Sequence, residues 1–288
     1  MRYDEYITQL GFTDDELKIL SIIDETCRES FQKDLSQARE EYDKGDEAFA
    51  TYLFAFAQKA DVPINTLNLY VYLRLMEDTY KEYEKRGIDK SVFIDSMMSF
   101  VISSRLPLGN GQPFGLSQPV YRSWLRRNLD CVIYRLGNLE FELLAAPCDM
   151  EIDSRSVKKG EICIGVHIPR GVRFDEVTCE DAYTRARVFF KKYYNMDNVI
   201  FSCWSWLLYP WLCEVLPETS SIVKFQKKFK LLQVDENNGG IGWIFGISID
   251  GKENQSIENL PEDTSLRRAA KQRLREGKNL GGGLGIRL

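Results

Sequence analysis

The stretch ICIGVHI at residues 162–168 decides the fold of the second half of this chain, because it is the clearest β-strand in the sequence. Its isoleucines and valine alternate with cysteine, glycine and histidine, which is the two-residue period of a strand. Residues 175–194 then show helical spacing, and a second strand pattern returns in VIFSCWSW at residues 199–206. A strand, a helix and a strand in this order predict two parallel, neighbouring strands joined by a right-handed crossover.

The carboxyl ends of these two strands carry polar residues. His167 lies near the end of the first strand, and Cys203 and Ser205 lie near the end of the second. Ligands of open α/β sheets bind in the crevice outside such ends. The helix that begins near residue 175 directs its N-terminus toward the same edge, where free N–H groups favour an anion by about 0.3–1 kcal/mol. We therefore expect the functional site at this edge.

Residues 3–100 show helical spacing, so the front of the chain is predicted to be an all-helical bundle. Thr13 and Glu16 form a capping box at the start of one helix, and Gly87 is placed to end another. Proline and glycine concentrate in LPLGNGQPFGLSQP at residues 106–119, which predicts a domain junction. The predicted fold class is α+β, with a helical domain over residues 1–118 and a mixed α/β domain over residues 119–288.

Further elements are expected in the second domain. A short helix at 120–129 should precede a β-hairpin, with strands at 131–135 and 139–145 joined by a Gly-Asn turn. The elements expected after the parallel strands are, in order, short helical pieces at 207–216 and 220–227, strands at 229–234 and 241–247, and a basic helix at 264–276. The final GGGLGIRL lacks the Lys-Ser/Thr of a P-loop and is predicted to be a flexible tail or an edge strand.

Composition and charge exclude several classes of function. No run of about 18 apolar residues is present, so we expect no membrane span. The first ten residues, MRYDEYITQL, carry charges where an export signal needs an apolar core, so we expect a cytoplasmic protein. The net charge of −5 and the acidic front half lack the concentrated basic face that nucleic acid requires.

The cysteine and histidine content argues against a metal site. The chain has seven cysteines and a single histidine, His167. An odd cysteine count without C-x-x-C spacing indicates reduced thiols rather than a disulfide framework. A structural zinc site needs several cysteines or histidines at short spacing, so we expect no metal.

Four separated motifs resemble one protein family in the same order. They are VHIPRG at 166–171, CWSWLLYP at 203–210, SSIVKFQKKF at 220–229 and LPEDTSLRRA at 260–269. They resemble bacterial acyltransferase-domain proteins, which pair a helical N-acyltransferase N-terminal domain with a GNAT-like mixed α/β C-terminal domain. The resemblance covers nearly the full length. It implies that the two parallel strands splay apart and hold an acyl-coenzyme A thioester, which an amine attacks directly.

One loop departs from the pattern of that family. The usual pyrophosphate-binding sequence, Gln or Arg followed by x-x-Gly-x-Gly/Ala, is replaced by PRGVR at residues 169–173. The coenzyme-binding residues that the resemblance indicates are Ile168, Arg170, Gly171 and Arg173. The two guanidinium groups suit phosphate oxygens, and the alternative is that they are ordinary surface arginines. Asp175, directly after this loop, would compete with a phosphate for the helix N-terminus.

His167 is the candidate general base. An amine with a pKa of about 10.4 is protonated at neutral pH, so transfer benefits from a base that titrates near the working pH. The unperturbed pKa of histidine, about 6.5, meets this need. The alternative is a hydrogen-bonded structural histidine.

Three more side chains are catalytic candidates. Cys203 could attack as a thiolate with His167 as its base, and a buried, inert cysteine is the alternative. Ser205 or Tyr209 could protonate the departing thiolate, a role often given to a hydroxyl in this fold. For Ser205 the alternative is a hydrogen bond to the backbone. The surrounding tryptophans are expected to pack in a core, and the charges of the helix at 264–276 are expected to form a solvated face.

These observations favour an acyl-coenzyme A dependent N-acyltransferase acting on a small-molecule or peptide amine. A non-catalytic binding or regulatory protein with the same fold is the first alternative, and a thiol hydrolase using Cys203 and His167 is the second. The acyl chain length, the acceptor and the oligomeric state stay open at this point.

Overall fold

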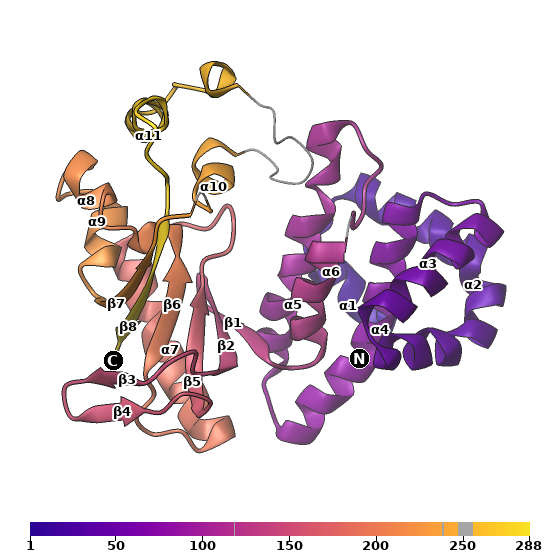
Figure 1. The fold of residues 1–288 in the computed structure, drawn as a ribbon. Helices are drawn as coiled ribbons and strands as arrows, with labels where there is room; N and C mark the ends of the chain where they lie inside the picture. Colours follow the sequence, from indigo (N-terminus) through magenta and orange to yellow (C-terminus); the bar gives the residue numbers. More distant parts are fainter. Residues whose placement is uncertain (118, 238, 247–255) are drawn as a thin grey trace. The chain divides into compact units, whose positions relative to one another are not determined.

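The computed structural model describes residues 1–117, 119–237, 239–246 and 256–288, with the backbone alone for residues 28–36 and 119–123. The chain divides into two compact units, Met1–Leu136 and Gly137–Leu288 (Figure 1). The division lies later in the chain than the predicted boundary after residue 118, which stays a prediction.

The first unit is built almost entirely of helices, as its spacing predicts. Its elements are α1 (Tyr3–Tyr6), η1 (Ile7–Gln9), α2 (Asp14–Lys44), α3 (Asp46–Ala60), α4 (Ile64–Arg86), α5 (Lys90–Ser104), η2 (Pro107–Asn110), α6 (Pro119–Leu129) and a closing strand β1 (Ile133–Leu136). Helix α4 packs against α1, α2, α3, α5 and α6. The capping box of Thr13 and Glu16 is confirmed, and Gly87 ends α4 in the left-handed conformation.

The segment rich in proline and glycine packs back onto α4. The N–H of Gly115 donates to Ser104 O at 3.0 Å, and the N–H of Leu116 donates to Asn65 O at 2.8 Å. Gly115 has a φ of +135°, and a Cβ there would lie 2.0 Å from Asn65 O. Glycine is therefore required at this position by the close approach of two backbones.

A mixed sheet forms the centre of the second unit. Within this unit its strand order is β2-β5-β6-β8-β7. These strands are β2 (Leu139–Ala145), β5 (Ile162–His167), β6 (Phe201–Ser205), β7 (Lys230–Asp235) and β8 (Gly282–Arg287). The strands predicted at 131–135, 139–145, 162–168, 199–206 and 229–234 are confirmed, with small shifts at their ends. A separate two-stranded sheet of β3 (Met150–Ile152) and β4 (Arg155–Val157) was not predicted, because strands of this length leave little period to detect.

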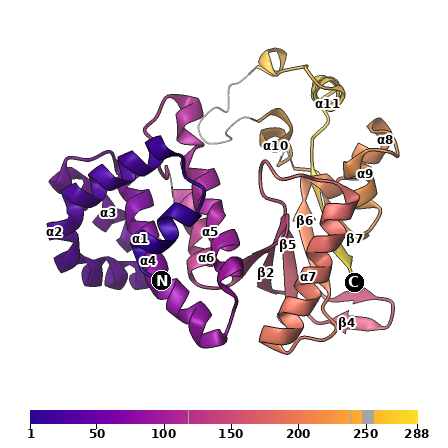
Figure 2. The ribbon, with the colours of Figure 1, turned by 180° about the vertical axis from the view of Figure 1, so that it is seen from behind.

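Helix α7 (Glu176–Tyr194) covers one face of this sheet (Figure 2). The ring of Tyr183 meets the rings of Phe141 and Phe201 edge to face, at 5.6 and 4.9 Å between centroids. These three residues come from α7, β2 and β6, so they fix the helix against the strands that carry the candidate site.

The predicted strand at 241–247 is wrong. The described residues form a short helix, α10 (Ile241–Phe245), in which the N–H of Ile244 donates to Gly240 O at 3.0 Å. Gly246 follows in the left-handed conformation that ends helices, and residue 247 lies outside the described residues. A short apolar run fits a buried helical turn as well as a strand, and the flanking glycines were the signal for the turn.

The C-terminal GGGLGIRL is neither a flexible tail nor an edge strand. It forms β8, which lies between β6 and β7, is antiparallel to both, and is buried along its whole length. A Cβ on Gly281 would lie 2.0 Å from Asp235 O, and one on Gly283 would lie 2.7 Å from Leu208 O. The glycines therefore allow close packing against the neighbouring backbone. From composition alone, such a glycine-rich segment resembles a flexible one.

The remaining helices form a second apolar core beside the sheet. They are η3 (Trp206–Leu208), α8 (Leu212–Val215), α9 (Ser221–Gln226), η4 (Ile257–Asn259) and α11 (Ser265–Arg275). Tyr209, Trp211 and Leu212 pack there with residues of α10 and α11. The short helices predicted at 207–216 and 220–227 and the helix predicted at 264–276 are confirmed.

Candidate active site

Strands β5 and β6 are parallel neighbours, as predicted, and their pairing stops before their carboxyl ends. They pair at only two positions, Ile164 with Phe201 and Gly165 with Ser202. Beyond this point β5 continues to His167 paired with β2, and β6 continues to Ser205 paired with β8. The ladder between the two parallel strands therefore ends before the strands do. Their last residues, which include the candidate side chains, are not paired with each other, and we call them the parted ends of β5 and β6.

The two faces of the parted strands differ in chemistry. Val166 lies opposite Phe141 in the register, on the face covered by α7. His167 is on the other face, because side chains alternate along a strand. Glu142 shares that face, since its register partner is Gly165, two residues before His167. An imidazole and a carboxylate thus lie together on the face of the sheet away from α7.

His167 and Glu142 are in direct contact. Nε2 of His167 lies 2.8 Å from Oε2 of Glu142, and the two side chains are 24% and 7% exposed. The sequence prediction singled out His167 and missed Glu142. The signal was present in LEFELLA, where two glutamates alternate with apolar residues inside a strand, a pattern that places charge on one face.

Cys203 is in the environment of an inert cysteine. Its side chain is fully buried on the same face as Phe201, which packs against α7. Burial raises the pKa of the Cys203 thiol to about 12. A thiol that stays protonated at neutral pH is a poor nucleophile, so the structure argues against a thiol hydrolase.

Ser205 makes a hydrogen bond to the backbone, which was the predicted alternative to a catalytic role. Its Oγ accepts from the N–H of Leu207 at 3.1 Å and so caps η3. The hydroxyl group also carries a proton, which the cap does not use. Ser205 ends β6, is half-buried and shares the α7 face with Phe201 and Cys203, so His167 approaches this end of the sheet from the opposite face. Its role as a donor stays a prediction.

Tyr209 is occupied by two charged partners. Its hydroxyl donates to Glu236 Oε2 at 2.6 Å and accepts from the Arg273 guanidinium at 2.7 Å. Burial and the Glu236 carboxylate raise the pKa of Tyr209. The Tyr209 proton is therefore held by Glu236, and the side chain belongs to the second apolar core.

The loop after β5 offers one exposed arginine near an aromatic ring. The guanidinium carbon of Arg170 lies 4.7 Å from the centroid of Trp243 in α10. Ile168 is half-buried, and Gly171 has a φ of +74° with open space where a side chain would lie. Backbone and arginine are thus both accessible in this loop, which suits a phosphate.

Asp175 caps the N-terminus of α7, so it occupies the backbone N–H groups for which it was expected to compete with a phosphate. Its carboxylate accepts from the N–H of Thr178 at 3.0 Å and also from Arg173. The Thr178 hydrogen bond lowers the pKa of Asp175. Arg173 therefore pairs with the capping residue Asp175, whereas Arg170 contacts the Trp243 ring instead.

A small cavity lies between α7 and α9, beside this helix start. Its charged lining residues are paired with each other: Lys228 with Glu176 at 2.9 Å and Arg287 with Glu180 at 2.9 Å. The hydrogen bonds from Arg287 lower the pKa of Glu180. These cations are neutralised within the protein, so the cavity adds little attraction for an anion.

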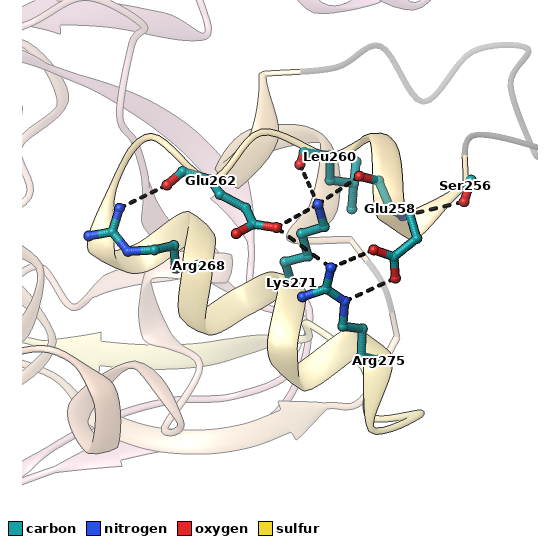
Figure 3. A network of polar contacts seen from close by, with 7 residues as sticks. All are labelled: Ser256, Glu258, Leu260, Glu262, Arg268, Lys271 and Arg275. Atoms are coloured by element: carbon teal, nitrogen blue, oxygen red, sulfur yellow. Dashed lines mark hydrogen bonds and ion pairs between the residues drawn. The ribbon is translucent and has the colours of Figure 1, made fainter.

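The basic helix α11 is the predicted solvated face only in part, because Arg268 and Arg275 are exposed whereas Lys271 is buried (Figure 3). The Lys271 side chain is only 5% exposed, and its ammonium donates to the carbonyls of Glu258 and Leu260 and pairs with Glu262 at 2.7 Å. Arg275 pairs with Glu258. The preceding acidic residues were the available signal, because their charge complements that of the helix.

No metal-binding cluster is present among the described residues: nowhere do three or more His, Cys, Asp or Glu side chains converge as ligands. Within the same part of the chain, every helix is too short or too polar to cross a lipid bilayer.

Comparison with known families gives the class of protein to which this fold belongs. Residues 133–287 match the family model described as a GNAT-like C-terminal domain. Residues 1–131 match the model described as an N-acyltransferase N-terminal domain. The chain therefore belongs to the N-acyltransferases that carry a GNAT-like C-terminal domain, as the four motifs indicated.

Solved structures with the same fold are acyltransferases. One, in complex with decanoyl-CoA and teicoplanin, is 19% identical with a TM-score of 0.66, and the match covers 100% of this chain and 99% of that chain. Another, in complex with decanoyl-CoA, is 24% identical with a TM-score of 0.64, and the match covers 78% of this chain and 66% of that chain. At these identities the likeness shows a shared fold. No curated protein matches the sequence.

Proposed function

We propose that this protein transfers an acyl group from acyl-coenzyme A to an amine by direct attack on the thioester. The observation that carries the proposal is the early end of the ladder between β5 and β6. Past Gly165 and Ser202 the two strands no longer pair with each other. Backbone groups along the parted edges can then pair with the amides of an extended pantetheine arm.

His167 supplies the base in this proposal. It accepts a proton from the attacking amine as the nitrogen forms a bond to the thioester carbonyl carbon. The carbon–sulfur bond breaks and coenzyme A leaves as a thiolate, so the products are an amide and, after protonation, free coenzyme A. General-base assistance of this kind contributes about 10²–10⁴ in rate.

Ser205 is the proposed donor to the leaving thiolate. Its Oγ is anchored by the Leu207 N–H, which leaves the hydroxyl proton to be donated. Tyr209 is the weaker candidate because its proton is already donated to Glu236. Cys203 is given no chemical role, since its thiol is buried and stays protonated.

The loop at 168–173 is the proposed phosphate site. Arg170 is exposed and positioned over Trp243, and Gly171 leaves its backbone open to a ligand. Ile168 and Arg173 complete the site, although Arg173 would have to share its guanidinium with Asp175. Phosphate binding would thus depend on arginine side chains more than on the capped N-terminus of α7.

The acceptor we propose is a small-molecule or peptide primary amine. Related structures hold octanoyl-CoA, decanoyl-CoA and teicoplanin, so medium-length acyl chains are the first to test. We also propose a cytoplasmic location, because seven free cysteines suit a reducing compartment. A bacterial source is what the family resemblance implies.

Two measurements test this function. Calorimetric titration with coenzyme A and with acetyl-, octanoyl- and decanoyl-CoA should give saturable heat. Mass spectrometry should then detect amide formed from decanoyl-CoA and a panel of primary amines that includes glucosamine and a peptide with a free lysine side chain. His167→Gln should reduce the rate about 100-fold or more with the heat of acyl-CoA binding retained. Unchanged turnover in that variant would remove His167 from the mechanism.

A non-catalytic binding protein is the second candidate, and the capped start of α7 favours it. Asp175 already occupies the helix N-terminus that a pyrophosphate would approach. Absence of heat with every coenzyme A derivative, together with an unchanged melting temperature, would support this candidate over the enzyme.

A further inference from the structure

We infer that Glu142 is a positioning residue that holds His167 as its Nε2–H tautomer, so that Nδ1 is the atom that accepts the proton. This inference rests on the proposed function, because it assigns a role within the same site. Nothing in the sequence motifs pointed to Glu142, which comes from β2, outside the parallel pair.

The register of β2 and β5 brings the two side chains together. Glu142 lies opposite Gly165, and His167 lies two residues further on the same face. The imidazole turns back over Gly165 to reach Glu142, with 2.8 Å between Nε2 and Oε2. A Cβ on Gly165 would lie 3.5 Å from Nε2 of His167, so a larger side chain would meet the ring.

The chemistry of the pair fixes which nitrogen carries the proton. A carboxylate accepts hydrogen bonds and donates none, so with Glu142 ionised the neutral imidazole presents N–H at Nε2. The lone pair is then on Nδ1. The Glu142 side chain is largely buried, so its contact with the imidazole is shielded from water and restricts rotation of the His167 ring.

The carboxylate also favours the product of proton transfer. When His167 accepts a proton it becomes an imidazolium, which the adjacent negative charge stabilises. Carboxylates behind histidines have this combined role of orientation and charge stabilisation in other enzymes. Glu140 lies opposite His167 in the register and is a second buried carboxyl group on this face.

The single histidine of the chain makes the test direct. Protein labelled with ¹⁵N-histidine gives one imidazole, whose two- and three-bond couplings report the tautomer. Wild type should show Nε2–H and unprotonated Nδ1 above the pKa of the ring. Glu142→Ala should convert this to a mixture of tautomers, while the exposed control Glu151→Gln should retain the wild-type pattern.

Turnover supplies the second readout, with decanoyl-CoA and the best amine of the panel. Glu142→Ala should lower kcat about 100-fold at an unchanged Kd for decanoyl-CoA, and Glu142→Gln, which can still accept through its amide oxygen, should recover part of the loss. An Nδ1–H tautomer in wild type would overturn the inference, as would wild-type kcat in Glu142→Ala. If wild type forms no amide but retains the Glu142-dependent tautomer, the proposed function fails while the positioning stands.

Discussion

The guanidinium carbon of Arg170 lies 4.7 Å from the centre of the Trp243 ring, which joins the loop after β5 to helix α10. Trp243 is half exposed, so this ring is available to hold the guanidinium at the surface. Such cation–π contacts contribute about 0.5–1 kcal/mol at exposed sites. Arg170 is thereby held at the loop proposed to receive phosphate, and this leads to the first prediction.

Arg170→Ala should weaken binding of decanoyl-CoA about tenfold, because a hydrogen bond to a charged group contributes about 1.5–3 kcal/mol. Trp243→Leu should weaken it less, since the arginine remains but loses its platform. Calorimetric titration measures both. Arg185→Ala is the matched control, because Arg185 is an exposed α7 residue paired with Asp181. Equal affinity in Arg170→Ala and wild type would place the phosphates elsewhere.

Cys203 should be unreactive toward iodoacetamide at neutral pH. Its thiol is fully buried and its pKa is raised to about 12, so almost no thiolate forms. Peptide mapping by mass spectrometry should find the label on the exposed Cys213 first. Cys203→Ala should retain turnover within about twofold, since the step is assigned to His167. Rapid labelling of Cys203 with loss of turnover would instead support the hypothesis that the protein is a thiol hydrolase.

Two adjacent glycines before and within β8 should respond very differently to the same substitution. A Cβ on Gly281 would lie 2.0 Å from Asp235 O, whereas the nearest atom to a Cβ on Gly282 is Ser205 O at 3.4 Å. Gly281→Ala should therefore cost more than about 3 kcal/mol of unfolding free energy, and Gly282→Ala less than about 1 kcal/mol. Chemical denaturation measures the difference, and similar costs for both variants would contradict the central position of β8.

Lys271 should contribute much more to stability than its neighbour Arg268. Lys271→Met keeps the apolar stem but removes the Glu262 pair and leaves the carbonyls of Glu258 and Leu260 without their donor (Figure 3). We expect a loss of about 2 kcal/mol, against about 0.5 kcal/mol or less for Arg268→Ala, whose bond to Glu262 O is exposed. Thermal unfolding and amide exchange at residues 256–263 compare them, and a smaller effect in Lys271→Met than in Arg268→Ala would be inconsistent with this network.

The sequence predicted the parts of the fold that depend on local period. The strand of His167, the long helix after it and the next parallel strand follow from apolar spacing, and their proximity follows from chain order. The same reasoning failed for Gly281 and Gly283. Their composition resembles a flexible tail, and only the position of neighbouring backbones shows that a side chain would not fit.

The candidate site was predicted only where it lies on the parallel pair. His167 was singled out as a candidate because it is polar at the end of an apolar strand. Glu142 was missed, since its contact with His167 depends on the antiparallel register of β2 and β5, which no local pattern fixes. The partners of Tyr209 were missed for the same reason: Glu236 and Arg273 are distant in sequence.

The central claim is that acyl-coenzyme A binds where β5 and β6 part, with its thioester beside His167. The most direct test is titration of decanoyl-CoA into protein labelled at its single histidine, followed by the imidazole resonances of His167. We predict a saturable shift of these resonances with the same Kd that calorimetry gives, and a weaker Kd in Arg170→Ala. Saturable heat with unmoved His167 resonances would contradict the claim, because the coenzyme would then bind away from this site.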